Sequence, residues 1–511
     1  MDTDVSWPDL VATALLGTGR RGSPVPCRPG QDAAQALLDA AAVHTVRRRA
    51  GALPGRARRR PGPAPDDPRP PLPPAARRRL TGILDDRAGP AGGRRAAGPD
   101  LVELLPQWLA AANGHGYRAQ DELLPGLLDA ARARTGLRPG ALTLAGPRGL
   151  WLARLNPQWA YALRTPAPGG PPPAPGDAQR TWAEGLFAER SAVLATLRRH
   201  DPAAGRALLA GTWATERAED RAAFVGLLRE GLSAADEPFL EQALDDRSRD
   251  VRALAAELLA ALPGSALAAR MTGRARRCVS RPGPLVTVEA PHACDAAMRR
   301  DGISADPPSG SDRGSWWLGR IVEMTPLGFW PGRLGVAGAA DAVALPVAGG
   351  RRADLHAAWC RAAVRSRDAE WARALLGPAT APPVPDGSPG RDPARLLSVL
   401  PPSERAAWAG RFVAAHGLSE AFRLLAVCEA PWARPLGRAV VDALVAAREA
   451  GGYPWSFSGV MGLAERCADP AEADRLAGAG PGPGPDHWTE AFARLEGTLR
   501  LRALMMRELE G

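Results

Sequence analysis

With 511 residues, the chain is too long for a single compact core, so two to four domains or a stack of helices is expected. Lysine is absent, and arginine gives a formal net charge of +10, which residues 47–99 supply by themselves with 14 Arg and 4 Asp. The rest of the chain is balanced, which gives no support to a basic cleft in the folded part, and without lysine a GxxxxGK[ST] phosphate loop is excluded.

Residues 1–165 are predicted to form an N-terminal helical domain. Its first helix, over 7–16, places apolar residues on one face. Gly17 then supplies the left-handed conformation of a helix C-cap. Further helices are predicted over 31–49, 100–112 and 121–134. Apolar residues also follow helical spacing over 141–164, but Asn156-Pro157 interrupts the pattern.

An Arg/Pro-rich segment interrupts this domain. Residues 50–75 are rich in Pro, Gly and Arg, which predicts a flexible loop, whereas 75–86 has a small apolar helical face. Its two arginine triplets are candidate contacts to the phosphates of an anionic partner, and the alternative is a solvated loop without a ligand. The triplets consist of Arg58, Arg59, Arg60, Arg77, Arg78 and Arg79.

A Pro/Gly linker is predicted over 166–178 and precedes a domain over 179–272. The clearest amphipathic pattern lies there: Val251, Leu254, Leu258 and their neighbours form a continuous apolar stripe at helical spacing. The helices expected in this domain span 179–199, 201–211, 215–231, 237–244 and 248–262.

Residues 236–262 resemble a HEAT repeat, with a short first helix, an acidic turn and Asp250-Val251-Arg252 at the start of the second helix. Residues 201–232 look like a diverged copy. The resemblance implies a HEAT-like α-solenoid. It also implies that Asp250 and Arg252 have a structural role in the repeat turn, where such residues often bridge neighbouring units.

The following segment, 273–350, is predicted to be an irregular connecting region. Leu285–Val288 is its best strand candidate and predicts a short hairpin; a buried helix is expected around Trp316–Val322. A C-terminal helical domain follows over 351–511. The expected fold is therefore all-α, with a minor irregular or β element near 280–345. The C-terminal helices are expected over 351–376, 393–400, 402–415, 418–429, 432–449, 456–467 and 486–508.

Motifs for catalysis are weak or missing. Gly17–Gly22 matches GxGxxG, but a helix precedes it where a dinucleotide site needs a strand. No GxSxG or HExxH motif occurs. Cys278, His292 and Cys294 offer three zinc ligands without a fourth, so structural placement is preferred. We therefore expect no catalytic, cofactor-binding or metal site, no cofactor and no enzyme activity.

The six cysteines are scattered and form no CxxC pair, which predicts reduced thiols in a cytoplasmic protein. No apolar run approaches the roughly 18–20 residues that a membrane span needs, so no membrane partner is expected. The N-terminal sequence lacks the features of a signal peptide.

Four segments carry a wider resemblance: WPDLVATALLGTGR near the start, RGLWLARLNPQW at 148–159, DPAAGRALL from 201, and RRDGI at 299–303. On these the chain resembles the uncharacterised bacterial domain-of-unknown-function 5691 family. The resemblance implies no known activity. Members tend to be encoded near a MoxR-type AAA+ ATPase and a von Willebrand A-domain protein, which implies one of these as a partner in a multi-protein system.

The leading hypothesis is a non-enzymatic helical scaffold for protein–protein interaction, because stacked helices offer a long contact surface. The alternative is a nucleic-acid-binding HEAT-like protein that uses the Arg-rich segments. An enzyme without a recognisable motif is the third possibility.

Overall fold

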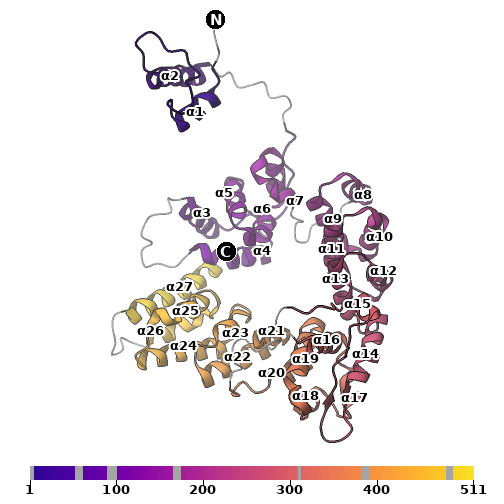
Figure 1. Cartoon of the computed structure of the whole chain (residues 1–511). Coiled ribbons are helices and arrows are strands. Elements are labelled where there is room, and N and C mark those ends of the chain that lie inside the picture. Colours follow the sequence, from indigo (N-terminus) through magenta and orange to yellow (C-terminus); the bar gives the residue numbers. More distant parts are fainter. Residues whose placement is uncertain are drawn as a thin grey trace. The chain divides into compact units, whose positions relative to one another are not determined.

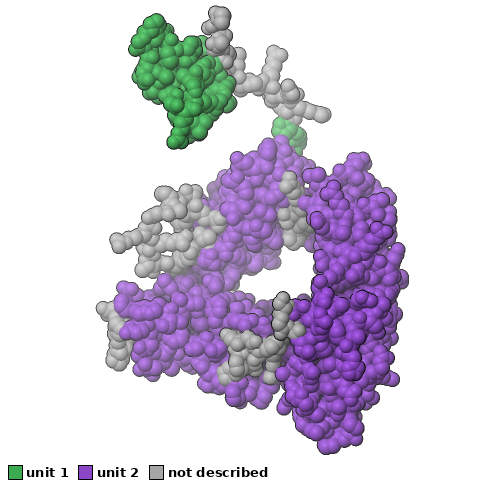
Figure 2. Space-filling view, viewed as in Figure 1, with its two compact units in different colours: residues 1–64 green, residues 65–511 purple. Residues whose placement is uncertain are grey.

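The computed structural model describes residues 5–51, 61–88, 101–164, 174–308, 312–382, 392–478 and 487–511. Helices α1 to α27 make up most of these ranges, together with one two-stranded sheet (Figure 1). The predicted all-α class is confirmed. The chain divides into two compact units, residues 1–64 and 65–511 (Figure 2). In the part of the chain that the structure describes, no helix is long and apolar enough to cross a membrane.

Unit 1 is a pair of helices, α1 (Trp7–Leu16) and α2 (Ala33–Gly51). The Ser6 side chain accepts the Asp9 amide at the start of α1, and Gly17 ends the helix with φ 82° and its N–H on the Thr13 carbonyl. The predicted C-cap is confirmed. The core of the pair is small: its buried residues in the described range are Leu10, Thr13, Ala36 and Leu37.

Unit 2 begins with α3 (Pro74–Ala88), α4 (Leu101–Gly114), α5 (Leu124–Ala133), α6 (Arg138–Leu155) and α7 (Tyr161–Arg164). They pack around the fully buried Trp108. Helix α6 is kinked at Gly146, where φ is 59°. A β-carbon there would lie 2.1 Å from Arg69 Nη2, so only glycine fits.

The end of the predicted flexible loop is held in place. Leu72 N–H donates to the Arg118 carbonyl at 3.1 Å, and Arg118 N–H donates to the Pro70 carbonyl at 2.9 Å. Arg69 Nη1 also donates to the Thr143 carbonyl at 2.7 Å. The expectation of flexibility over 50–75 therefore does not extend to residues 69–72, because backbone hydrogen bonds from distant segments fix them.

The next helices pack on one another in series: α9 packs on α10 and α11, α11 on α13, and α12 on α13. The predicted helix over 179–199 is divided at Gly185, where a β-carbon would lie 2.3 Å from the Thr181 carbonyl. The first of its two halves begins at Pro175, inside the predicted linker. The helices are α8 (Pro175–Glu184), α9 (Phe187–His200), α10 (Pro202–Thr212), α11 (Ala218–Leu227), α12 (Glu237–Ala243), α13 (Arg249–Ala260) and α14 (Ala266–Cys278).

The predicted hairpin is present: β1 (Val279–Ser280) pairs antiparallel with β2 (Thr287–Val288). The region expected to be irregular also holds short helices, because Pro and Gly divide its apolar runs into pieces. They are α15 (Ala296–Arg300), α16 (Arg313–Met324), α17 (Phe329–Leu334) and α18 (Ala339–Ala344), and α16 matches the predicted buried helix.

Nine helices complete unit 2 in the described ranges. The predicted helix over 351–376 is broken at Arg367, which adopts a left-handed conformation with φ 53°. The nine are α19 (Arg352–Ser366), α20 (Ala369–Leu376), α21 (Pro393–Val399), α22 (Pro402–His416), α23 (Phe422–Ala426), α24 (Arg434–Glu449), α25 (Ser458–Cys467), α26 (Ala473–Gly478) and α27 (His487–Glu510).

The last helix joins two hydrophobic cores. The first half of α27, with Trp488 and Leu495, belongs to the large core that starts in α8. Its second half, with Leu509, belongs to the core of α3 to α6. Arg79 and Glu508 form an ion pair at 2.7 Å, and α27 packs directly on α3 and α4. The end of unit 2 therefore stabilises its beginning.

Candidate functional site

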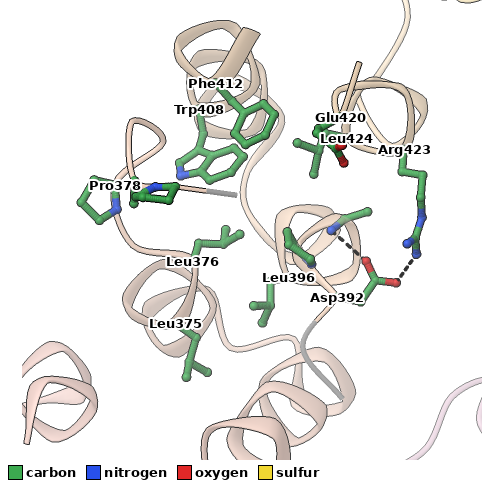
Figure 3. A pocket seen from close by; sticks show the side chains of 14 residues that line it. Leu375, Leu376, Pro378, Asp392, Leu396, Trp408, Phe412, Glu420, Arg423 and Leu424 are labelled. Carbon is green, nitrogen blue, oxygen red and sulfur yellow. Dashed lines mark hydrogen bonds and ion pairs between the residues drawn. The ribbon is translucent and has the colours of Figure 1, made fainter. Parts of the chain in front are cut away.

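A pocket of about 230 Å³ lies among α20, α21, α22 and α23 (Figure 3). Most of its wall is apolar, with two rings on one side and leucines on the other, and ionisable side chains lie at one end. The lining residues are Leu375, Leu376, Pro378, Ala381, Pro382, Asp392, Pro393, Ala394, Leu396, Trp408, Phe412, Glu420, Arg423 and Leu424.

The aromatic side of the pocket comes from one turn of α22. Trp408 and Phe412 are four residues apart, so their rings lie on the same helix face and stack with centroids 5.4 Å apart. The indole N–H of Trp408 donates to the Gly377 carbonyl at 3.0 Å. This bond fixes the ring against the end of α20, where Gly377 turns the chain with φ 68°.

The polar end is set by the start of α21. The carboxylate of Asp392 accepts the Ala394 backbone N–H at 3.1 Å and Arg423 Nη2 at 2.7 Å, as the dashed lines in Figure 3 show. Glu420 adds a second carboxylate to the lining. The lining thus carries two acidic side chains and one basic side chain.

The volume decides what the pocket can hold. Small-molecule sites usually enclose about 300–1,000 Å³. A smaller apolar pocket with a charged end suits one side chain of a bound polypeptide, which can anchor there by burying apolar area.

The predicted arginine contacts are only partly brought together. Arg58, Arg59 and Arg60 lie outside the described residues. Arg77 and Arg78 line a shallow depression of about 290 Å³ with Pro74 and Thr81.

Two arginines of the second triplet have carboxylate partners. Arg77 pairs with Glu122 at 2.7 Å, with both side chains about half exposed. Arg79 forms an ion pair with Glu508, and its hydrogen bonds to that carboxylate raise the pKa of the guanidinium. Arg78 is exposed on α3.

The repeat-turn residues lie at the start of α13. Arg252 Nη1 donates to the carbonyls of Asp246 at 2.7 Å and Arg247 at 3.0 Å, inside its own turn. Asp250 occupies the first turn of the helix, where a carboxylate favours the dipole. A role of this pair between neighbouring units stays a prediction.

The alternative zinc site finds no support in the part of the chain that the structure describes, where no three His, Cys, Asp or Glu side chains cluster as metal ligands would. Burial raises the pKa of both the Cys278 and the Cys294 thiols, which favours their neutral form.

A model of a family of unknown function, DUF5691, matches residues 9–509. The chain belongs to this family. The match includes both helices of unit 1 almost completely and nearly all of unit 2. No curated protein and no solved structure matches the chain.

For this family member, sequence reasoning missed the pocket. The available signal was the Trp408–Phe412 pair at helical spacing, in the helix predicted over 402–415. The pattern is typical of any buried helix face, so nothing local separates a pocket wall from ordinary core.

Proposed function

We propose that this chain is a cytoplasmic, non-enzymatic scaffold that binds a protein partner through the pocket among α20, α21, α22 and α23. The observation that carries the proposal is the pocket itself: a stacked aromatic pair beside leucines, at a volume that suits one apolar side chain. The partner segment inserts this side chain and places a basic residue near Glu420, because Asp392 is already paired with Arg423. The family resemblance suggests a MoxR-type AAA+ ATPase or a von Willebrand A-domain protein as the first candidates.

The test fills the pocket from an exposed position. Ala381 lines the pocket and is exposed, so Ala381→Trp occupies the space without creating a cavity. Binding to each purified candidate is measured by titration calorimetry. We expect Ala381→Trp to weaken the productive complex by about tenfold or more, since loss of a buried anchor usually costs over 1 kcal/mol.

The matched control is Ala415→Trp, which adds the same ring at an exposed site of α22 outside the lining. It should leave the affinity unchanged. A partner that binds both variants equally well does not use the pocket, and this result overturns the proposal.

Nucleic-acid binding is the second candidate, because Arg77 and Arg78 share one depression. The ion pair of Arg77 with Glu122 weakens this alternative, since that guanidinium already has a carboxylate partner.

A further inference from the structure

The second helix of unit 1 is apolar on two sides. One side carries Ala36 and Leu37, which are buried within the unit. On the other side, Leu38, Ala42 and Val46 follow one another at intervals of four residues, and all three are exposed. A helix with apolar side chains on two sides usually packs against a neighbour on each of them.

The apolar side chains on this second side of α2 are strongly exposed. Leu38 and Val46 are each 63% exposed, and Val43 beside them is 49% exposed. We call Leu38, Ala42, Val43 and Val46, together with Arg47 and Arg49, the outer face of α2. The small core of unit 1 buries little apolar area, so a further helix on this face would add to its stability.

The positive charges of the outer face lie at one end. Arg47 follows Val43 by four residues and Arg49 follows Val46 by three, so both guanidinium groups extend the apolar rows. In the described part of unit 1, no carboxylate pairs with either of them; the acidic side chain of the face, Asp39, accepts amide hydrogens from Gln31 at 2.8 Å and Gln35 at 3.0 Å. The face therefore presents exposed aliphatic side chains, with Asp39 among them, and two arginines at one end that pair with no carboxylate in the described part of unit 1.

We propose that the outer face of α2 docks an amphipathic helix of another protein, with leucine-like residues along the contact and acidic residues at the end that meets Arg47 and Arg49. Opposite charge at that end sets the direction of the bound helix, while the apolar rows supply the affinity.

Two other occupants fit the face less well. A second copy of this chain would offer Arg47 and Arg49 only the Asp39 carboxylate of its own outer face, which already accepts two amide hydrogens. An anionic membrane would meet the same carboxylate, and the face lacks the exposed aromatic residues of interfacial helices. Trp7 is not available for that role, because Arg48 lies over its ring at 5.0 Å.

The inference extends the scaffold role to a surface in the other compact unit, and it can fail separately. Ala381→Trp should leave binding at the outer face intact, and deletion of residues 1–64 should leave binding at the pocket intact.

The experiment uses the full chain and a fluorescein-labelled synthetic helix with leucines at i, i+4 and i+8 and three glutamates at one end. A second peptide carries lysines in place of the glutamates. Binding is followed by anisotropy at low and moderate salt. We expect the glutamate peptide to bind more tightly than the lysine peptide by about tenfold, because only its charges complement the arginines.

Three variants locate the contact. Leu38→Glu combined with Val46→Glu should weaken the glutamate peptide by about tenfold or more. Arg47→Glu combined with Arg49→Glu should reverse the preference, so that the lysine peptide binds better. Leu155→Glu, at a 49% exposed leucine of unit 2, is the matched control and should change nothing. Circular dichroism verifies that each variant keeps its helix content.

Four results overturn the inference. They are equal binding of both peptides, unchanged binding by the Leu38/Val46 variant, dimerisation that the same variant abolishes, and binding to phosphatidylglycerol vesicles that it abolishes. The last two assign the face to a second copy or to a membrane surface.

Discussion

At the scale of single residues, one buried arginine, Arg198, connects several helices of unit 2. Arg198 is fully buried and pairs with the fully buried Asp236 at 2.9 Å, and its remaining donors reach the carbonyls of Pro202, Leu228, Glu230 and Gly231. Desolvating such a pair is costly, and only dense hydrogen bonding offsets the cost. The pair therefore connects α9, α10, α11 and α12 at one point.

Breaking the Arg198–Asp236 pair should strongly lower the free energy of unfolding. Asp236→Asn leaves the Arg198 charge buried without its partner, so the free energy of unfolding should fall by about 3–5 kcal/mol. Glu404→Gln removes one partner of an exposed pair with Arg373 and should cost less than about 1 kcal/mol. Urea unfolding of both variants decides the matter, and equal losses would show that burial does not strengthen the Arg198 pair.

Acid should weaken the fold through the same carboxylate. Burial alone would raise the pKa of Asp236, but hydrogen bonds from Arg198 and Arg206 outweigh it and hold the pKa below its ordinary value. A lowered pKa in the folded state contributes stability above the unfolded pKa, near 3.8, and this stability is lost as pH falls through the folded pKa. Urea midpoints from pH 6 downward should fall less steeply for Asp236→Asn than for the parent chain; parallel profiles would contradict the assignment.

Ionisation of Glu472 has the opposite effect on stability from ionisation of Asp236. Burial raises its pKa, and Arg475 and Arg438 only partly oppose that effect. Because the folded state holds this proton more strongly, ionisation of Glu472 opposes folding above its unfolded pKa. Glu472→Gln should therefore raise the urea midpoint at pH 7 and leave it nearly unchanged below the unfolded pKa. A lower midpoint at pH 7 would show that the carboxylate is stabilising.

At the scale of elements, α27 is the helix whose loss should reach furthest along the chain. Leu509 is fully buried in the core of α3 to α6, and Tyr117 donates its hydroxyl hydrogen to the Leu509 carbonyl at 3.0 Å. These contacts join residues almost 400 positions apart, so no local sequence pattern predicts them.

Truncation of that leucine tests the connection. Leu509→Ala should lower the free energy of unfolding by about 2–5 kcal/mol, because it removes buried apolar area and leaves a cavity. Hydrogen exchange should quicken in α3 and α4 while α13 stays protected. Leu504→Ala, at an exposed site of the same helix, is the control. Uniform loss of protection would mean that the helices unfold as one cooperative body.

At the scale of the whole molecule, the two units can be tested for independence. Unit 1 and unit 2 are each compact by themselves. A chain without residues 1–64 should keep the helix content of unit 2 and melt in the same cooperative step, as circular dichroism can show. A shift of the melting temperature by several degrees would mean that unit 1 contributes to the stability of unit 2.

Substitution tests the role of the charge excess in residues 47–99 better than deletion of a segment does. Removing residues 50–99 would also remove α3, whose Leu80 and Ile83 are fully buried, and would damage the fold. Changing Arg58, Arg59, Arg60, Arg77 and Arg78 to Gln keeps α3. Under the scaffold proposal, any gel shift of a DNA duplex at low salt disappears at about 0.2 M salt and in this variant. A shift that survives both conditions would favour the nucleic-acid alternative.

The sequence by itself determined the kind of each element. Apolar side chains three and four residues apart, as in α13, select a helix, and Gly17 ends α1 because its backbone can adopt positive φ. These effects act within one or two helical turns. Breaks at Gly185 and Arg367 were missed because the apolar pattern continues across them.

Only the tertiary structure decided which faces meet. The Arg198–Asp236 pair, the junction of α27 with α3 and the pocket between Trp408 and Leu376 all depend on segments that are far apart in the chain. An amphipathic stripe indicates that a helix face is buried, but many other helices would bury that face equally well. The choice follows from the packing of all helices at once, which no short stretch of sequence contains.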